Sequence, residues 1–261
     1  MNIRDAPPLL YRYRGTAGPG LDRLKKIVVD GEHHLSSPAV FNDPFDCRPR
    51  YLFNSSDQAV REYLDRLFAK FEPHLSAVAR AAEVKAILND PNRDPRRQDN
   101  QQLFAAMMGT FGTDNVGVLC LSESGTVPLM WSHYAESHSG VALGYDSSVH
   151  PFSEALPVKY SKLRPSVDST VHSQTEILEN TLFTKSEDWA YECEWRIVMT
   201  SGPGKYQIPK ETLKSIILGA LATNDLLREI LEWVRSLPHP VEIHRASTSS
   251  KTFELEVRRY R

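Results

Sequence analysis

The strongest constraint on the fold is the order in which strand-like and helix-like periodicities follow one another along the chain. Short segments with β-branched and aromatic residues begin the sequence and return after residue 116, whereas residues 55–110 repeat apolar side chains at helical spacing. Strands and helices that are neither strictly alternating nor segregated favour an α+β fold with a mixed, largely antiparallel sheet. We therefore expect one domain over residues 1–261, with a helical insert at 55–110.

The expected elements can be placed by residue range. Strands are predicted at 9–14, 33–37, 116–122, 140–146, 157–161, 194–200, 206–209, 215–219, 241–246 and 253–260. Helices are predicted at 21–29, 55–71, 74–88, 101–111, 172–184 and 223–236, with a polar loop at 90–100. A short helix is predicted between the strands at 116–122 and 140–146.

Composition excludes several classes of protein. The net charge of −2 over 261 residues gives no overall basic field for binding a nucleic-acid duplex. The apolar runs are far shorter than the roughly 20 residues that cross a bilayer, and the first residues have no signal-peptide pattern. Three cysteines without paired spacing are typical of a reducing compartment. We expect a cytoplasmic protein that does not bind membranes.

The first candidate site segment is Tyr-Arg-Tyr-Arg at residues 11–14. In a strand, Arg12 and Arg14 lie on one face and Tyr11 and Tyr13 on the other, because successive side chains alternate. Two guanidinium groups on one face can bind phosphates through paired hydrogen bonds. The alternative is an ordinary solvated strand with charged residues.

The second segment, residues 36–47, has the sequence Ser-Ser-Pro-Ala-Val-Phe-Asn-Asp-Pro-Phe-Asp-Cys. Its Asn-Asp-Pro centre predicts a turn in which side chains bond to the local backbone. Asp43 and Asp46 lie close enough to orient a neighbouring group, but they supply too few ligands for a metal ion. Ser36 and Ser37 are the polar residues at the end of the preceding strand.

The third segment, residues 128–141, contains Met130, Trp131 and Tyr134 on one side of a helical turn. Aromatic residues at this spacing are more often core than contact surface. His133 and His138 are five residues apart, which is not the spacing of a helical zinc site.

The fourth segment begins at Lys185 and continues as Trp-Ala-Tyr-Glu-Cys-Glu-Trp-Arg at residues 189–196. If residues 191–198 are extended, Glu192, Glu194 and Arg196 share one face. They then form either a row of cross-strand ion pairs or a pair of carboxylates that stabilises a cation in a transition state.

Taken together, these segments resemble an uncharacterised bacterial family of the abortive-infection type. The resemblance rests on the ordered occurrence of YRYR, SSPAVFNDPFD, CLSES, MWSHYAESHSGV, K…WAYECEWR and IILG, between about residues 9 and 220. The joint pattern is specific, and the helical insert carries none of it. Such a resemblance implies a role in phage defence, while members of the family are largely without an assigned activity.

The chain also resembles, more weakly, the ADP-ribosyltransferase toxins that modify nucleic acid or protein. Those folds place an arginine or histidine, a serine or tyrosine, and a glutamate on three strands. The matching residues here are Arg12 or Arg14, Ser36 or Ser37, and Glu192 or Glu194. The resemblance implies NAD as substrate, a nucleic acid or protein as acceptor, and no metal.

Within this resemblance, Glu194 is the expected catalytic carboxylate and Glu192 its partner. Breaking the bond between nicotinamide and ribose builds positive charge on the sugar, which a fixed carboxylate stabilises. Arg14 is expected to bind the pyrophosphate, with Tyr13 and Trp131 stacking on the bases. Two alternatives remain open: a metal-independent nuclease using His133 or His138 as general acid or base, and a non-catalytic module that binds nucleotides or nucleic acid.

Overall fold

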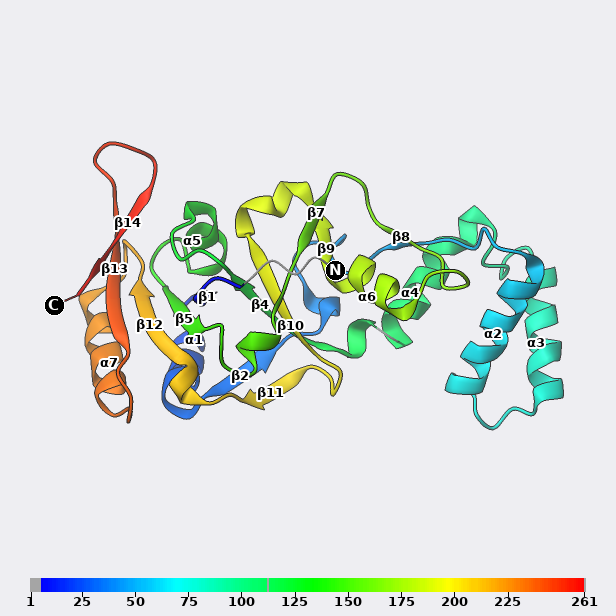
Figure 1. Ribbon diagram of the computed structural model, residues 1–261, viewed down its shortest axis with the longest axis horizontal. Coiled ribbons are helices and arrows are strands. Elements are labelled where there is room, and N and C mark those ends of the chain that lie inside the picture. The colour runs from blue at the N-terminus through cyan, green and yellow to red at the C-terminus, as the bar shows by residue number, and fades with distance from the viewer. Residues whose placement is uncertain (1–5, 112, 261) are drawn as a thin grey trace. The chain divides into compact units, whose positions relative to one another are not determined.

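The computed structural model describes residues 6–111 and 113–260, and these pack as two compact units (Figure 1). Unit 1 is formed by the described parts of Met1–Ser37, Val116–Val158 and Asp188–Arg261. Unit 2 is formed by Pro38–Asn115 and Lys159–Glu187. The expected helical insert at 55–110 therefore lies inside unit 2, which also takes in a segment from later in the sequence.

Unit 1 is built on a large sheet. Within the described residues, eight strands follow the spatial order β14 (Leu255–Arg259), β13 (Glu242–Thr248), β12 (Leu213–Leu218), β5 (Val141–Asp146), β1 (Leu9–Arg14), β4 (Gly117–Ser122), β10 (Glu194–Met199) and β6 (Leu156–Pro157). All neighbouring pairs are antiparallel except β12 and β13, which the helix α7 (Asn224–Arg235) connects in parallel. The mixed α+β class and the largely antiparallel sheet are thus confirmed.

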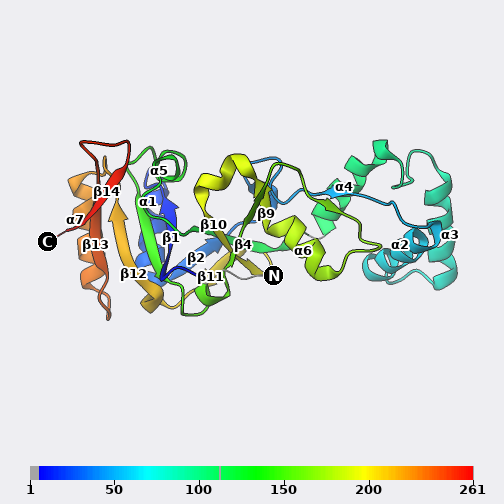
Figure 2. The same ribbon diagram turned by 45° about the horizontal axis from the view of Figure 1, so that its top comes forward.

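Three helices cover this sheet. One face packs against α1 (Gly20–Lys25), which continues as a π-helical turn at Lys26–Asp30, and against α7. Both views show α7 beside β13, and its Leu226, Ile230 and Trp233 pack with Ile216 and Ile243 of the sheet (Figures 1 and 2). On the opposite face lies α5 (Pro128–Tyr134), whose Trp131 packs with Tyr13, Ala142 and Ile217.

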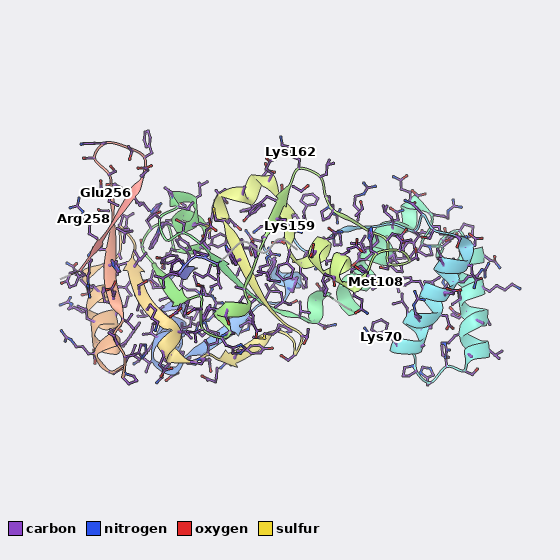
Figure 3. The ribbon with its side chains drawn as sticks, viewed as in Figure 1. Lys70, Met108, Lys159, Lys162, Glu256 and Arg258 are labelled. Atoms are coloured by element: carbon purple, nitrogen blue, oxygen red, sulfur yellow. The ribbon has the colours of Figure 1, made fainter. Side chains whose placement is uncertain are left out.

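The remaining elements of unit 1 are short. Strand β2 (Glu32–Leu35) pairs with β11 (Gly204–Gln207), and single turns of 3-10 helix occur at Phe152–Glu154 and Lys210–Thr212. The edge strand β14 carries Glu256 and Arg258, whose exposed side chains lie 2.8 Å apart (Figure 3). Charged side chains on an edge strand oppose pairing with another chain.

Unit 2 is mainly helical. It contains α2 (Asp57–Phe71), α3 (Ala77–Asn89), α4 (Gln101–Phe111) and α6 (Gln174–Leu182), with 3-10 turns at Pro38–Val40, Gln98–Asn100 and Thr113–Asn115. Helices α2, α3 and α6 are preceded by the N-cap residues Ser56, Ser76 and Ser173, whose hydroxyl groups accept hydrogen bonds from the first turn. Two parallel pairs, β3 (Arg50–Tyr51) with β8 (Ser166–Val167) and β7 (Lys159–Ser161) with β9 (Thr184–Ser186), complete it.

The strand predicted at 194–200 is confirmed as β10, but the condition that would place Glu192 on its charged face is not met. Residues 191–198 are not continuously extended: a 3-10 helix runs from Glu187 to Glu192, and β10 begins at Glu194. Between them Cys193 has a φ of 45°, in the left-handed region, so the alternation of side chains is interrupted there. Glu194 and Arg196 share a face as expected, but Glu192 does not belong to that strand.

Candidate functional site: a cationic pocket at the end of strand β1

A pocket of about 840 Å³ opens in unit 1 where β1 ends and the loop to α1 begins. Its volume is typical of sites for small molecules and cofactors. The pocket is lined by Arg14, Gly15, Ala17, Pro19, Gly20, Arg23, Leu24, Lys26, Ile27, Glu32, His34, Ser36, His133, Tyr134, Glu136 and Lys205.

The ionisable residues of this pocket leave an excess of positive charge. Lys205 is paired with Glu32 at 3.1 Å, whereas the structure gives Arg14, Arg23 and Lys26 no ion-pair partner among the described residues. The second carboxylate of the lining, Glu136, accepts hydrogen bonds from the loop at residues 16–17, so these three cations outnumber it and attract an anion.

Arg14 is the most constrained of these cations. It is the last residue of β1, its side chain is half-buried, and its Nε atom is buried without a hydrogen-bond partner in the described part of the chain. Burial lowers the pKa of the Arg14 guanidinium, and the nearby charge of Arg23 adds to this effect. The charged form is therefore held in an unfavourable environment that a bound anion would relieve.

The wall formed by residues 15–17 is fixed by Glu136. Its carboxylate accepts hydrogen bonds from the backbone N–H groups of Thr16 and Ala17, both at 2.8 Å, and from the Thr16 hydroxyl at 3.1 Å. These hydrogen bonds, chiefly that from the Thr16 backbone, hold the pKa of Glu136 below its usual range. Glu136 is consequently a positioning residue for the loop beside Arg14.

Aromatic rings adjoin the cationic part of the pocket. His133 and Tyr134 line it, and the rings of Trp189 and Tyr191 each lie 6.4 Å from the His133 ring. His133 is exposed, while Tyr134, Trp189 and Tyr191 are half-buried. Tyr134 and Tyr191 pack on the cluster around Trp131, and the partial exposure of these rings leaves part of each aromatic surface open to a planar ligand.

Glu192 is the buried carboxylate bonded to a residue of the pocket lining. The Tyr134 hydroxyl donates a 2.7 Å hydrogen bond to Glu192 Oε1, and the Ser122 hydroxyl donates to the Glu192 carbonyl oxygen. The Glu192 side chain is 3% exposed. Tyr134 therefore links the buried Glu192 carboxylate to the pocket lining.

Glu194 lies on the other face of the sheet from Arg12 and Arg14. Strand register pairs Tyr11 with Ser122 and Ser122 with Glu194, so these three side chains share one face, and Arg12 and Arg14 project from the opposite one. Arg196 donates to both oxygens of Glu194, at 2.7 and 2.9 Å, and both residues are buried. The pleat thus separates the two groups that the sequence was expected to bring together.

Arg12 is bonded to the neighbouring small sheet. Its Nη1 donates to His33 Nδ1 at 3.2 Å and its Nη2 donates to the His34 carbonyl oxygen at 2.7 Å. Burial lowers the pKa of His33 to about 4, with a further contribution from the charge of Arg14, so at neutral pH the ring accepts from Arg12. Arg12 thereby fastens β1 to β2, and Arg14 is the arginine of the pair that lines the pocket.

Tyr13 and Trp131, expected to stack on bases, are core residues. Tyr13 is 5% exposed and Trp131 is fully buried, and their rings contact edge to face at 5.2 Å. Each polar atom bonds to backbone: the Tyr13 hydroxyl donates to the Ser124 carbonyl, and Trp131 Nε1 donates to that of Gly125. Neither ring has a face open to a ligand, which agrees with the core interpretation of this helical spacing.

The two serines of the second segment differ in position. Ser36 forms an antiparallel bridge with Val118 and lines the pocket, and Ser37 follows it as a half-buried residue that does not belong to the lining. In the adjoining turn, Asp43 accepts from the backbone N–H of Phe45 at 2.9 Å, as the turn interpretation predicts. In unit 2, Asp46 lies 3.6 Å from the buried Lys185 ammonium group.

The two histidines of the third segment also separate. His133 lines the pocket, whereas His138 lies 3.1 Å from the Ser132 hydroxyl. Among the residues that the structure describes, no three His, Cys, Asp or Glu side chains are grouped so that they could hold a metal ion.

Sequence reasoning did not single out Arg23, Lys26, Lys205 or Glu136. Arg23, Lys26 and Lys205 are exposed charged residues whose sequence neighbourhoods have no distinctive pattern. They meet Glu136 only because α1, the small sheet and the turn after α5 converge. The ESH segment after the helix was visible as a motif, but its role in fixing the loop at residues 15–17 depends on a contact 120 residues away.

Comparison with known proteins matches part of the chain to a family. Residues 130–197 match the model described as "Protein of unknown function (DUF2971)". This region includes most of α5 together with Glu136, Glu192, Glu194 and Arg196, and agrees with the expectation of an uncharacterised family. No curated protein and no solved structure gives a match. Within the described residues, no helix has the length and apolar character needed to cross a membrane.

Proposed function

We propose that this chain binds a nucleotide through its phosphate groups in the pocket at the end of β1. The observation that carries the proposal is Arg14, whose buried Nε has no partner and whose neighbouring cations, Arg23 and Lys26, have no ion pair among the described residues. A phosphate supplies oxygens for the guanidinium and neutralises a charge that burial disfavours.

The rings beside the cations support a nucleotide rather than a simple anion. His133 and Tyr134 line the same pocket, and Trp189 and Tyr191 extend this aromatic surface. Stacking of a base on such rings contributes roughly 1–3 kcal/mol in proteins that bind single-stranded nucleic acid. Phosphate recognition by Arg14 and base stacking beside it together favour ligands with both groups.

Binding of ADP, NAD, adenosine and inorganic phosphate, measured by calorimetry at low and high salt, tests this proposal. We expect ADP and NAD to bind more tightly than either fragment, and added salt to weaken the binding. Arg14→Gln should weaken the binding of ADP at least about tenfold, because a charge-assisted hydrogen bond contributes about 1.5–3 kcal/mol to the binding free energy.

Arg228→Gln is the matched control, since Arg228 is an exposed arginine of α7 outside the pocket. Arg14→Lys should recover part of the affinity through its charge but not the paired geometry. Equal ADP affinity in wild type and in Arg14→Gln, with both proteins folded, would rule out this role of the pocket.

ADP-ribosyl transfer from NAD is a second candidate, favoured by the hydrogen bond between Tyr134 and Glu192. In this reaction the bond between the nicotinamide nitrogen and ribose C1′ breaks, and its electron pair leaves with nicotinamide. An acceptor nucleophile of a nucleic acid or protein then bonds to C1′ and releases its proton. A nearby carboxylate stabilises the positive charge that develops on the ribose. A role in bacterial phage defence or a toxin system belongs to this candidate.

The two glutamates give a direct test of the transferase. With labelled NAD and a cell extract, Glu192→Gln should abolish nicotinamide release and label transfer while ADP still binds. Glu194→Gln removes the negative charge that is paired with the buried Arg196 guanidinium, so its main expected effect is lower stability. Loss of release in Glu194→Gln with retained stability would instead identify Glu194 as the catalytic carboxylate. No release by the folded wild type would leave nucleotide binding as the function.

A further inference from the structure

A second pocket of about 620 Å³ lies on the sheet in unit 1, near its β14 edge. It is lined by Leu9, Tyr11, Lys214, Ser215, Ile217, Pro240, Val241, Glu242, His244, Val257 and Arg259, and it shares none of these residues with the pocket at the end of β1. Six of the eleven are apolar or aromatic, which is the usual character of a small-molecule site.

Two buried polar atoms in this lining have no hydrogen-bond partner among the described residues. Ser215 is 4% exposed, and its Oγ is unpartnered. His244 Nδ1 is likewise buried and unpartnered, while its Nε2 lies 3.6 Å from Glu242. A buried polar group without a partner costs about 1–3 kcal/mol, so both atoms are unusual in a native sheet.

The fold presents Ser215 to the pocket by an irregularity of β12. Leu213 pairs with Tyr145 and Ser215 with Gly144, so Lys214 is an extra residue in β12 relative to β5. Such a bulge redirects the side chains that follow it. It leaves Leu213 in the core beside Tyr145 and places Ser215 on the face that Tyr11 occupies.

Gly144 makes this arrangement possible. A Cβ atom at residue 144 would lie 2.3 Å from Ser215 Oγ, closer than Cβ atoms approach, and would make a tight 3.1 Å contact with the Tyr11 ring. Only glycine at this central position of β5 therefore leaves the Ser215 hydroxyl in its place.

The charges around the pocket favour a negatively charged ligand. Glu242 is occupied by Arg259 at 3.1 Å and by His244, and the Lys214 ammonium lies 3.8 Å from Asp146, at the limit of an ion pair. The lining thus contains two cations, Lys214 and Arg259, against the single carboxylate of Glu242, which Arg259 already pairs. A hydroxyl donor beside a loosely held ammonium group suits a carboxylate, and the surrounding apolar side chains suit an apolar body.

From this geometry we infer that the pocket on β12, β13 and β14 binds a small carboxylate with an apolar body, such as an aromatic acid. The Ser215 hydroxyl and the Lys214 ammonium bind the carboxylate, and Tyr11, Ile217 and Val257 contact the apolar part. This site is separate from the nucleotide pocket and does not depend on its function.

Phenylacetate is a suitable probe, with acetate and phenylacetamide as the ligands that lack the apolar body or the charge. Binding is followed by backbone amide chemical shifts of the full chain, with and without saturating ADP. We expect phenylacetate to perturb β12, β13 and β14 and to bind at least about fivefold more tightly than either control, equivalent to about 1 kcal/mol. ADP should leave this affinity unchanged.

Ser215→Ala distinguishes a ligand site from a structural role. Because the hydroxyl has no partner among the described residues, its removal should leave thermal stability unchanged or raised, while phenylacetate binds about fivefold more weakly. Ser247→Ala, at an exposed position of β13 outside the pocket, is the matched control and should change neither.

Val257→Trp offers an independent test, since Val257 is half-buried on the edge strand and a larger side chain there fills the pocket. It should abolish phenylacetate binding in a folded protein. The inference is overturned if folded wild type does not bind phenylacetate, or if both Ser215→Ala and Val257→Trp bind it like wild type.

Discussion

At the scale of single residues, the most informative groups are polar side chains whose charged state conflicts with their surroundings. Arg14 is charged but lacks a partner at Nε, and His33 lies beside Arg12 with Arg14 nearby. Among the described residues, both the unpartnered Arg14 Nε and the low pKa of His33 follow from one face of β1, where alternation places two guanidinium groups against buried neighbours. Only Arg14 remains accessible to a ligand, since Arg12 is bonded to β2.

His33 makes the stability of unit 1 depend on pH. Its pKa is lowered from 6.5 to about 4, chiefly by burial, so between these values the unfolded chain binds more protons than the folded one. The His33 contribution is fully present above pH 6.5 and is lost as the pH falls toward 4. The free energy of unfolding should decrease by about 3 kcal/mol from this group across that window.

His33→Asn removes the titration while an amide oxygen can still accept from Arg12. Urea unfolding followed by tryptophan fluorescence at pH 7.5 and 4.5 should show a smaller pH-dependent loss in the variant than in wild type. His34→Asn, the exposed neighbour, should retain the wild-type dependence. An identical loss in wild type and His33→Asn would contradict the assignment.

At the scale of elements, sequence periodicity predicted most of the sheet and helices but not the places where backbone conformation breaks the pattern. The strands at 9–14, 140–146 and 215–219 and the helices at 101–111 and 223–236 follow directly from alternation or helical spacing. Glu192 was misassigned because a single left-handed residue, Cys193, separates it from β10. Nothing in the residue types around Cys193 requires a positive φ, since non-glycine residues adopt it only under tertiary constraint.

The candidate site was predictable only in part for the same reason. Arg14, Ser36 and His133 were identified from their motifs and do line one pocket. Alternation along β1 also places Arg14 and Tyr13 on opposite faces of the sheet. Whether Glu194 lies on the face of Arg14 or on that of Tyr13 depends on strand order. Because β4 lies between β1 and β10, its register determines that Glu194 and Arg14 face opposite ways. Strand order and register are long-range properties that local patterns do not encode.

The turn after α5 contains three successive non-glycine residues with positive φ: Glu136 at 51°, Ser137 at 49° and His138 at 70°. Such a conformation costs roughly 1–2 kcal/mol per residue. The turn directs Glu136 to the N–H groups of Thr16 and Ala17, so strain in one element fixes the pocket wall formed by another.

Ser137→Gly should relieve part of this strain. Ser137 is exposed, and glycine adopts a positive φ without cost, although it loses more entropy on folding. We expect a net gain of about 0.5–1 kcal/mol in the free energy of unfolding, measured by urea denaturation. Ser247→Gly, in β13 with an ordinary φ, should instead lose a similar amount. Destabilisation by Ser137→Gly as large as that by Ser247→Gly would show that the turn is not strained.

At the scale of the whole molecule, the expectation of one domain over 1–261 stays a prediction that compact packing alone does not test. The described residues form two units with separate clusters of buried side chains. The cluster of unit 2, around Tyr51, Phe53, Val60 and Phe104, shares no residue with those of unit 1. Residues 159–187 belong to unit 2 because they pair with β3 and pack on its helices. The paired strands are more than 100 residues apart in sequence, so local patterns could not predict this contact.

Separate cores predict that the two units lose structure at different denaturant concentrations. The chain allows this to be measured without labels, because its four tryptophans, Trp131, Trp189, Trp195 and Trp233, all belong to unit 1. By contrast, most of the helical circular-dichroism signal comes from unit 2, which contains α2, α3, α4 and α6. Tryptophan fluorescence and circular dichroism at 222 nm should therefore give urea midpoints that do not coincide.

A paired substitution identifies which transition belongs to which unit. Phe104→Ala removes a buried ring from the core of unit 2. It should lower the free energy of unfolding measured by circular dichroism by several kcal/mol and leave the fluorescence midpoint unchanged. Ile230→Ala removes a fully buried side chain from the face of α7 that packs on the sheet of unit 1. It should lower the fluorescence midpoint instead. If both variants move both transitions together, the units unfold as one, and residues 1–261 form the single cooperative domain that the sequence predicts.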